Sequence, residues 1–194
     1  MTESIVFATD TDEGVRLLTM NWFMEDEPQF IPGLLQTEEY ARALIRLGSA
    51  VSEDEISRRA ELRVSRQEVL SGPNPPQLWA VVDEGALRRP VGGREVVREQ
   101  IQHLIRMADH PAVTLQILPF NAGPHSAMGG PFTILRFAEP DLHDVVYLEQ
   151  LTSALYLDKA TEVDSYLEVR EQLCLQAEPA GNTTKVLNQI LAET

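Results

Sequence analysis

Three residues in the second half of the chain have the types and spacing that acid–base chemistry needs. His125 lies in a glycine-rich loop, 123–130, where glycine lets the backbone approach a ligand closely. Its imidazole, with an ordinary pKa of about 6.5, suits proton transfer near neutral pH. Tyr147 and Glu149 alternate with apolar residues on a predicted strand, so both project from the same face. His125, Glu149 and Tyr147 are therefore the candidate catalytic residues.

A binding pocket is predicted beside these residues, between a sheet and its helices. Phe132 begins the strand after the loop, and Gly129 and Gly130 precede it. Loops held by rigid strands often carry binding sites, so we expect these residues to contact a ligand together with the candidate catalytic groups. The sequence leaves two alternatives open. The loop could be an ordinary exposed hairpin, and Glu149 could form an ion pair across the sheet.

Charged and amide side chains elsewhere form a second group of candidate ligand-binding residues. Asp83 and Glu84 end an apolar segment that is predicted to be a buried strand. Arg63 and Gln67 are spaced i and i+4 on a predicted helix and could pair with them. Such a network could bind a ligand or only join two elements. The Gln36 amide, which donates and accepts, is expected either to fasten its loop to the domain or to contact a ligand.

Helices and strands are expected to alternate along the chain. Thr37 is a typical N-cap with acidic residues after it, and Ser52 with Glu55 forms a capping box. Apolar periodicity and turn residues set the remaining boundaries. Helices are predicted over 38–48, 52–70, 97–108, a long segment that includes 163–174, and 183–192, and strands over 77–83, 113–118, 132–137 and 144–150.

The order of these elements predicts the fold class. A short turn at 140–141 joins two strands, which indicates an antiparallel hairpin, whereas an all-parallel sheet would need a crossover between every pair of strands. The fold predicted is α+β: a mixed, largely antiparallel β-sheet packed with amphipathic helices, with a helical C-terminus. Three regions are expected: an N-terminal extension, 1–27, with short strands at 5–8 and 15–18; a main domain, 28–178; and a C-terminal helix, 179–194.

The composition limits the expected partners and cofactors. Among 194 residues, 16 are basic and 30 are acidic, for a net charge of −14. Because basic contacts with phosphates supply most nucleic-acid affinity, direct binding of nucleic acid is not expected. Apolar segments are too short to cross a membrane, and the N-terminus lacks the basic region of a signal peptide, so a cytoplasmic location is expected. Cys174 is the sole cysteine, and the motifs predict neither a metal nor a cofactor.

The segment 32–43 reads PGLLQTEEYARA and resembles the signature of the DUF5753 family. In actinobacterial regulators, WhiJ-like proteins included, that domain usually follows a helix-turn-helix of the XRE type. The resemblance therefore implies an effector domain that senses a ligand or binds a partner, such as a small protein of the DUF397 type. Further matches occur at Arg63, Arg66 and Gln67; at Asp83, Glu84, Leu87, Arg88, Gly92 and Gly93; and at Phe132, Leu135, Val146, Tyr147 and Glu149.

Three functions follow as hypotheses. Residues 1–27 are expected to be too short and too acidic for the helix-turn-helix, so we expect this chain not to bind DNA by itself. The leading hypothesis is a domain that binds a small-molecule ligand, a natural-product intermediate or a partner protein. A second is a stand-alone, cofactor-independent biosynthetic enzyme: a cyclase, isomerase or hydrolase of a natural product, recruited from such a domain. A third is an antitoxin-like protein that binds a small partner.

Overall fold

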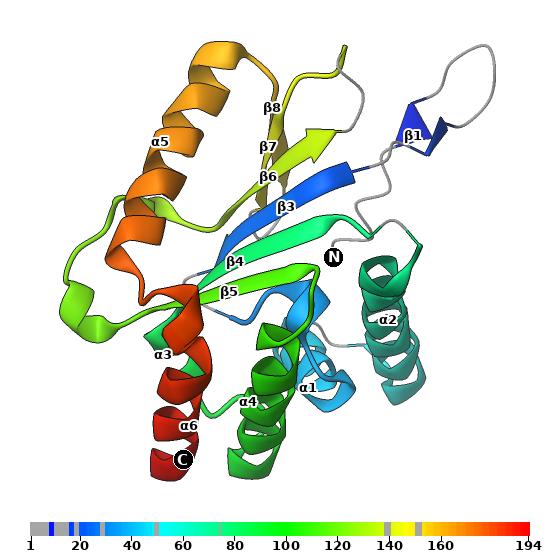
Figure 1. Ribbon diagram of the computed structural model, residues 1–194. Coiled ribbons are helices and arrows are strands. Elements are labelled where there is room, and N and C mark those ends of the chain that lie inside the picture. Colours follow the sequence, from blue (N-terminus) through cyan, green and yellow to red (C-terminus); the bar gives the residue numbers. More distant parts are fainter. Residues whose placement is uncertain are drawn as a thin grey trace.

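The main sheet has six strands in the order β5-β4-β3-β6-β7-β8 (Figure 1). The computed structural model describes residues 8–9, 16–17, 20–27, 30–48, 51–73, 75–137, 141–149 and 153–194. Neighbours β3–β4 and β4–β5 are parallel, and the other three pairs are antiparallel. The predicted α+β class with a mixed, largely antiparallel sheet is therefore confirmed. The strands are β3 (Met20–Glu27), β4 (Gln77–Asp83), β5 (Val113–Leu118), β6 (Phe132–Phe137), β7 (Val145–Glu149) and β8 (Ala154–Leu157).

The helices begin where the capping residues predict. The Thr37 hydroxyl accepts the backbone N–H of Tyr40 at 3.3 Å before α1, and the Ser52 hydroxyl accepts that of Glu55 at 3.3 Å before α2. The predicted helix over 52–70 is shorter in the structure, because α2 passes into the 3-10 helix η2 (Arg66–Ser71). The α-helices are α1 (Glu38–Gly48), α2 (Glu53–Ser65), α3 (Glu84–Arg88), α4 (Arg94–Ala108), α5 (Ala160–Gln176) and α6 (Thr183–Glu193).

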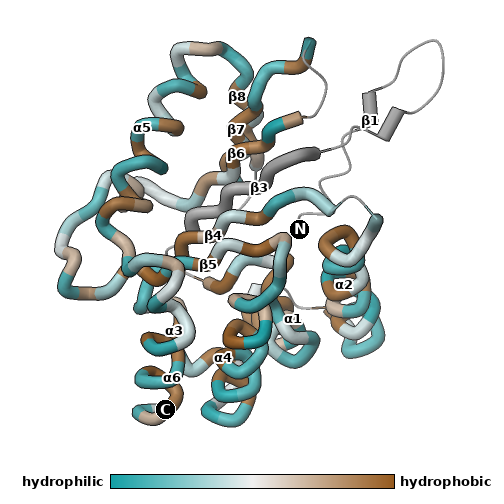
Figure 2. The backbone as a smooth tube through the Cα atoms, in the orientation of Figure 1, coloured by the Kyte–Doolittle hydropathy of each residue, from teal (hydrophilic) through white to brown (hydrophobic). Residues whose placement is uncertain are grey.

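Helices cover the two faces of the sheet unequally. Figure 1 shows α5 on one face and α1, α4 and α6 on the other. On the α4 face, Leu78 and Ile117 join a large apolar core. On the α5 face, Val81 and Ile134 pack with Leu173 of α5. Hydrophobic stretches coincide with these strands and with parts of the helices that flank them (Figure 2).

Two strands, β3 and β8, extend the fold beyond the predicted elements. Within the range expected to be an N-terminal extension, β3 is a central strand, and a two-stranded pair, β1 (Ala8–Thr9) and β2 (Arg16–Leu17), overlaps the short strands predicted there. The edge strand β8 was not predicted. The C-terminal helix α6 is present and supplies Leu187 and Ile190 to the large core. The turn expected at 140 lies partly outside the described residues.

Candidate functional site

A cavity of about 360 Å³ opens on the α5 face of the sheet. Its walls come from three parts of the chain that are far apart in sequence. The loop between β5 and β6 supplies Ser126, Ala127, Gly129, Gly130 and Pro131, the strands β6 and β7 supply Phe132 and Leu148, and α5 supplies Ser165, Tyr166 and Val169. The structure thus contains a cavity between the sheet and a helix, as predicted, and Gly129, Gly130 and Phe132 line it.

The loop wall is a short 3-10 helix, η4 (Ser126–Gly129), anchored at one point. Ala127 is only 3 % exposed and packs in the core beneath α5, whereas Met128 beside it is 70 % exposed. Gly130 follows with φ +134°, a backbone conformation that side chains other than hydrogen rarely allow. The glycine therefore lets the chain turn from the loop into β6 at the rim of the cavity.

The opposite wall is held by packed aromatic and apolar groups. The rings of Phe132 and Tyr166 lie 5.1 Å apart, a separation typical of favourable aromatic pairs. Leu148 packs in the same core. The Ser165 hydroxyl donates to the Thr161 carbonyl at 3.0 Å, as exposed helical serines often do. The cavity lining is thus somewhat more apolar than polar, with hydroxyls at its edge.

His125 directly precedes this loop helix but does not line the cavity. Its ring is half-buried, and its Nδ1 is buried with no hydrogen-bond partner within the described part of the chain. The backbone carbonyl of His125 accepts the N–H of Met128 at 3.3 Å and so closes the first turn of η4. In this arrangement His125 shapes the loop.

Tyr147 and Glu149 lie on the face of the sheet opposite to the cavity. Leu148 lines the cavity, and successive side chains of a strand point to opposite faces. The two predicted partners do meet: the Tyr147 hydroxyl donates to Glu149 Oε2 at 3.4 Å. Burial, with Glu149 and Tyr156 nearby, raises the pKa of Tyr147 to about 12. The prediction that they share one pocket with His125 and Phe132 is therefore wrong, because the sheet separates them.

Gln36 is the centre of a buried network that fastens the turn η1 (Gly33–Leu35) to the domain. Its amide donates to the Ile31 carbonyl at 2.6 Å, and its oxygen accepts from Arg63 at 3.1 Å. Gln67 donates to the Gln36 backbone carbonyl at 2.6 Å. Of the two roles expected for Gln36, the geometry matches fastening of the loop.

Asp83 and Glu84 serve the ends of helices and do not pair with Arg63 or Gln67, contrary to the predicted network. Asp83 accepts the backbone N–H of Gly85 at 2.6 Å and caps α3. Glu84 accepts from Arg88 at 2.6 Å and from the backbone N–H of Phe120 at 2.9 Å. Arg63 instead donates to Gln36, because α2 packs against η1.

The described residues lack two features, a metal-binding cluster and a membrane-spanning helix. No group of three or more His, Cys, Asp or Glu side chains there could hold a metal ion. In the same residues, no helix combines the length and apolar character needed to cross a membrane.

The site residues that sequence reasoning missed are those of α5, Leu148 and Pro131. Ser165 and Val169 are spaced i and i+4, which puts them on one side of a helix. That spacing alone does not distinguish a cavity wall from an ordinary helix flank. Only the position of the β5–β6 loop beside α5 makes these residues part of a cavity.

Comparison with known proteins agrees with the resemblance carried by the segment 32–43. The model of one family, described as a domain of unknown function (DUF5753), matches residues 24–189. That range includes β4 to β8, the loop and α5 that line the cavity, and most of α6. No curated protein and no solved structure matches the chain. The chain belongs to the DUF5753 family.

Proposed function

We propose that this chain is a binding domain for a small, mostly apolar ligand, and that the ligand occupies the cavity under α5. The observation that carries this proposal is the cavity itself, whose volume of about 360 Å³ falls in the range of about 300–1,000 Å³ typical of ligand sites. The apolar walls suit a hydrophobic body, and the hydroxyls of Ser126 and Tyr166 suit one or two polar groups on it.

The wall structure also suits a signalling role. One wall is a loop anchored by Ala127, and the other is the packed pair of Phe132 and Tyr166. A ligand that contacts both would favour one arrangement of the loop against α5, since ligands shift populations toward the state they bind better. The signature segment resembles that of a domain found in regulators of the XRE type. In such a regulator, this shift would alter DNA affinity through a separate domain. We place this role in the cytoplasm.

A neutral apolar fluorophore, N-phenylnaphthylamine, tests the cavity directly. The variant Gly129→Leu places a side chain at the cavity lining, where a Cβ meets no atom within 4 Å. We expect it to weaken dye binding by about tenfold or more while the unfolding midpoint changes little. The matched control is Gly181→Leu, an exposed glycine of the 3-10 helix η5 (Ala180–Asn182) whose Cβ is equally unobstructed.

The titration has two clear outcomes. If Gly129→Leu weakens binding and Gly181→Leu does not, the dye occupies the cavity. If both variants bind the dye as the unchanged chain does, the cavity is not the site and the proposal fails. If the dye does occupy the cavity, thermal shifts with chemically grouped metabolite pools identify the natural ligand class, because a ligand at about 100 times its Kd stabilises the fold by about 2.7 kcal/mol.

A further inference from the structure

The two edges of the sheet are protected differently. At the β5 edge, the chain after α5 covers the strand: the backbone N–H of Glu178 donates to the Ile117 carbonyl at 2.9 Å, and the Thr183 hydroxyl donates to the Leu115 carbonyl. The Gln116 side chain adds a bond to the Glu178 carbonyl at 3.0 Å. At the other end of the sheet, β8 pairs with β7 and with no other strand of the described residues.

The strand β8 is short, which itself limits pairing, but it contains no lysine, proline or bulge. Natural edge strands are often interrupted by lysine, proline or a bulge, or covered by another element. The four residues of β8 are Ala-Leu-Tyr-Leu, and Leu155 and Tyr156 are each 54 % exposed. In an antiparallel pair, backbone groups not bonded to the neighbour point to the outer edge. This strand therefore offers a short apolar template for another strand.

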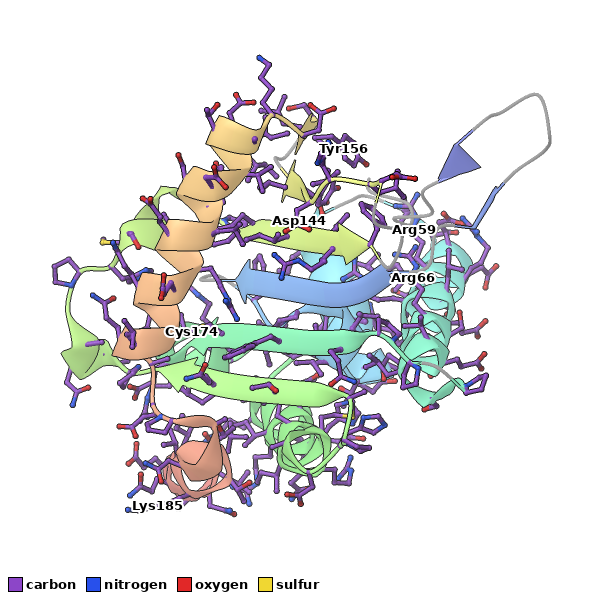
Figure 3. The ribbon with its side chains drawn as sticks, turned by 45° about the horizontal axis from the view of Figure 1, so that its top comes forward. Arg59, Arg66, Asp144, Tyr156, Cys174 and Lys185 are labelled. Atoms are coloured by element: carbon purple, nitrogen blue, oxygen red, sulfur yellow. The ribbon has the colours of Figure 1, made fainter. Side chains whose placement is uncertain are left out.

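The β8 edge is also held in place. The Tyr156 ring lies 5.1 Å from that of buried Tyr147, its partner across the β7–β8 pair, and Leu155 pairs with Leu148, whose side chain lines the cavity. Figure 3 shows Tyr156 at the end of the sheet away from Lys185 of α6. The β8 edge is thus joined to β7 by side-chain contacts and lies away from α6.

The charges around β8 indicate the kind of strand that fits. Asp158 directly follows β8, and Glu162 lies in the first turn of α5. Lys159 is the one basic residue in the described stretch 153–164. The whole chain has a net charge of −14, which opposes pairing of β8 with a second copy.

We propose that β8 is the docking site for an extended, basic segment of a partner protein, which adds to the sheet as a further strand. Backbone hydrogen bonds along β8 supply affinity, as in other cases of strand addition, and alternate side chains contact Leu155 on one face and Tyr156 on the other. Basic side chains of the partner meet the acidic surroundings. This surface is separate from the ligand proposal, because it needs no molecule in the cavity.

A displayed library of random peptides of about ten residues, selected against the full chain, is the test. We expect enriched peptides that alternate β-branched or aromatic residues with basic ones. Binding should weaken by about tenfold or more in about 0.5 M salt, where exposed charges are screened. N-methylation of every second peptide residue in one phase should abolish binding, and in the other phase should not, because one edge of the added strand stays free.

Two variants locate the peptide. Leu155→Lys puts a repelling charge on the edge and should weaken binding by about tenfold or more. Leu175→Lys makes the same change at a leucine of α5 that is 81 % exposed, and should leave binding unchanged. Thermal unfolding of both variants confirms that the fold is retained. A conservative variant, Leu155→Val, should keep binding because β-branched residues suit strands.

Three results would overturn the proposal. The first is a library that yields no peptide sensitive to Leu155→Lys. The second is a peptide whose binding is indifferent to the phase of N-methylation, because recognition would then be by side chains alone. The third is a dimer of this chain, seen by sedimentation equilibrium and broken by Leu155→Lys but not by Leu175→Lys, because a second copy would then be the occupant.

Discussion

The side-chain amide of Gln100 donates to the carbonyl oxygen of Leu35 at 2.7 Å, in the fully buried core between α4 and the turn η1. The same amide's oxygen accepts the backbone N–H of Thr37 at 2.7 Å. One side chain from α4 thus satisfies two backbone groups around Gln36. Together with the bonds from Arg63 and Gln67, it makes the PGLLQT segment a fixed junction between α1, α2 and α4. The family signature in this chain marks structure and lies apart from the cavity.

Replacing Gln100 by methionine should destabilise the domain by about 2–4 kcal/mol. Methionine keeps the length of the side chain but leaves the Leu35 carbonyl and the Thr37 N–H without partners, and each buried unpaired group costs about 1–3 kcal/mol. Urea unfolding measures the change. The control is Gln102→Met on the exposed side of the same helix, which should change stability by less than about 0.5 kcal/mol. Equal effects of the two variants would contradict the role given to Gln100.

Gly92→Ala should destabilise the domain by about 1–3 kcal/mol. Gly92 has φ +70°, and a Cβ there would lie 2.9 Å from the Cβ of Ala43 and 3.1 Å from a methyl group of Val96. The turn before α4 packs too closely on α1 to admit a methyl group. Thermal unfolding measures the change, with Gly181→Ala as the control because its Cβ meets nothing within 4 Å. A Gly92→Ala variant as stable as Gly181→Ala would show that the turn can relax.

Tyr147→Phe should reduce the loss of stability at alkaline pH. The folded-state pKa of Tyr147 is raised from 10.0 to about 12, so the folded chain holds this proton more tightly than the unfolded chain. That contribution is complete below about pH 10 and is lost as the pH rises toward about 12. Urea midpoints at pH 8 and pH 11, taken for both chains, give the difference. The unchanged chain should lose more stability over this interval; identical losses would contradict the raised pKa.

The local signals in the sequence predicted most elements well. Caps at Thr37 and Ser52 mark boundaries that the structure keeps, because such residues act on the backbone next to them. The strand β8 was missed because its partner β7 and its edge position identify it more than its four residues do. For β3, whose neighbours in the sheet are β4 and β6, the pairing partners come from distant parts of the sequence.

The candidate site divides in the same way between sequence and tertiary structure. The sequence by itself determined that Tyr147 and Glu149 share a face, since strand alternation is local, and that the 123–130 loop is rich in glycine. The face of the sheet on which α5 packs depends on the direction that the chain takes after β8. Because α5 packs where it does, Leu148, Phe132 and the 123–130 loop lie on the cavity face. Tyr147 and Glu149 lie on the opposite face. Packing between distant segments, which no local pattern encodes, decided where a ligand could bind.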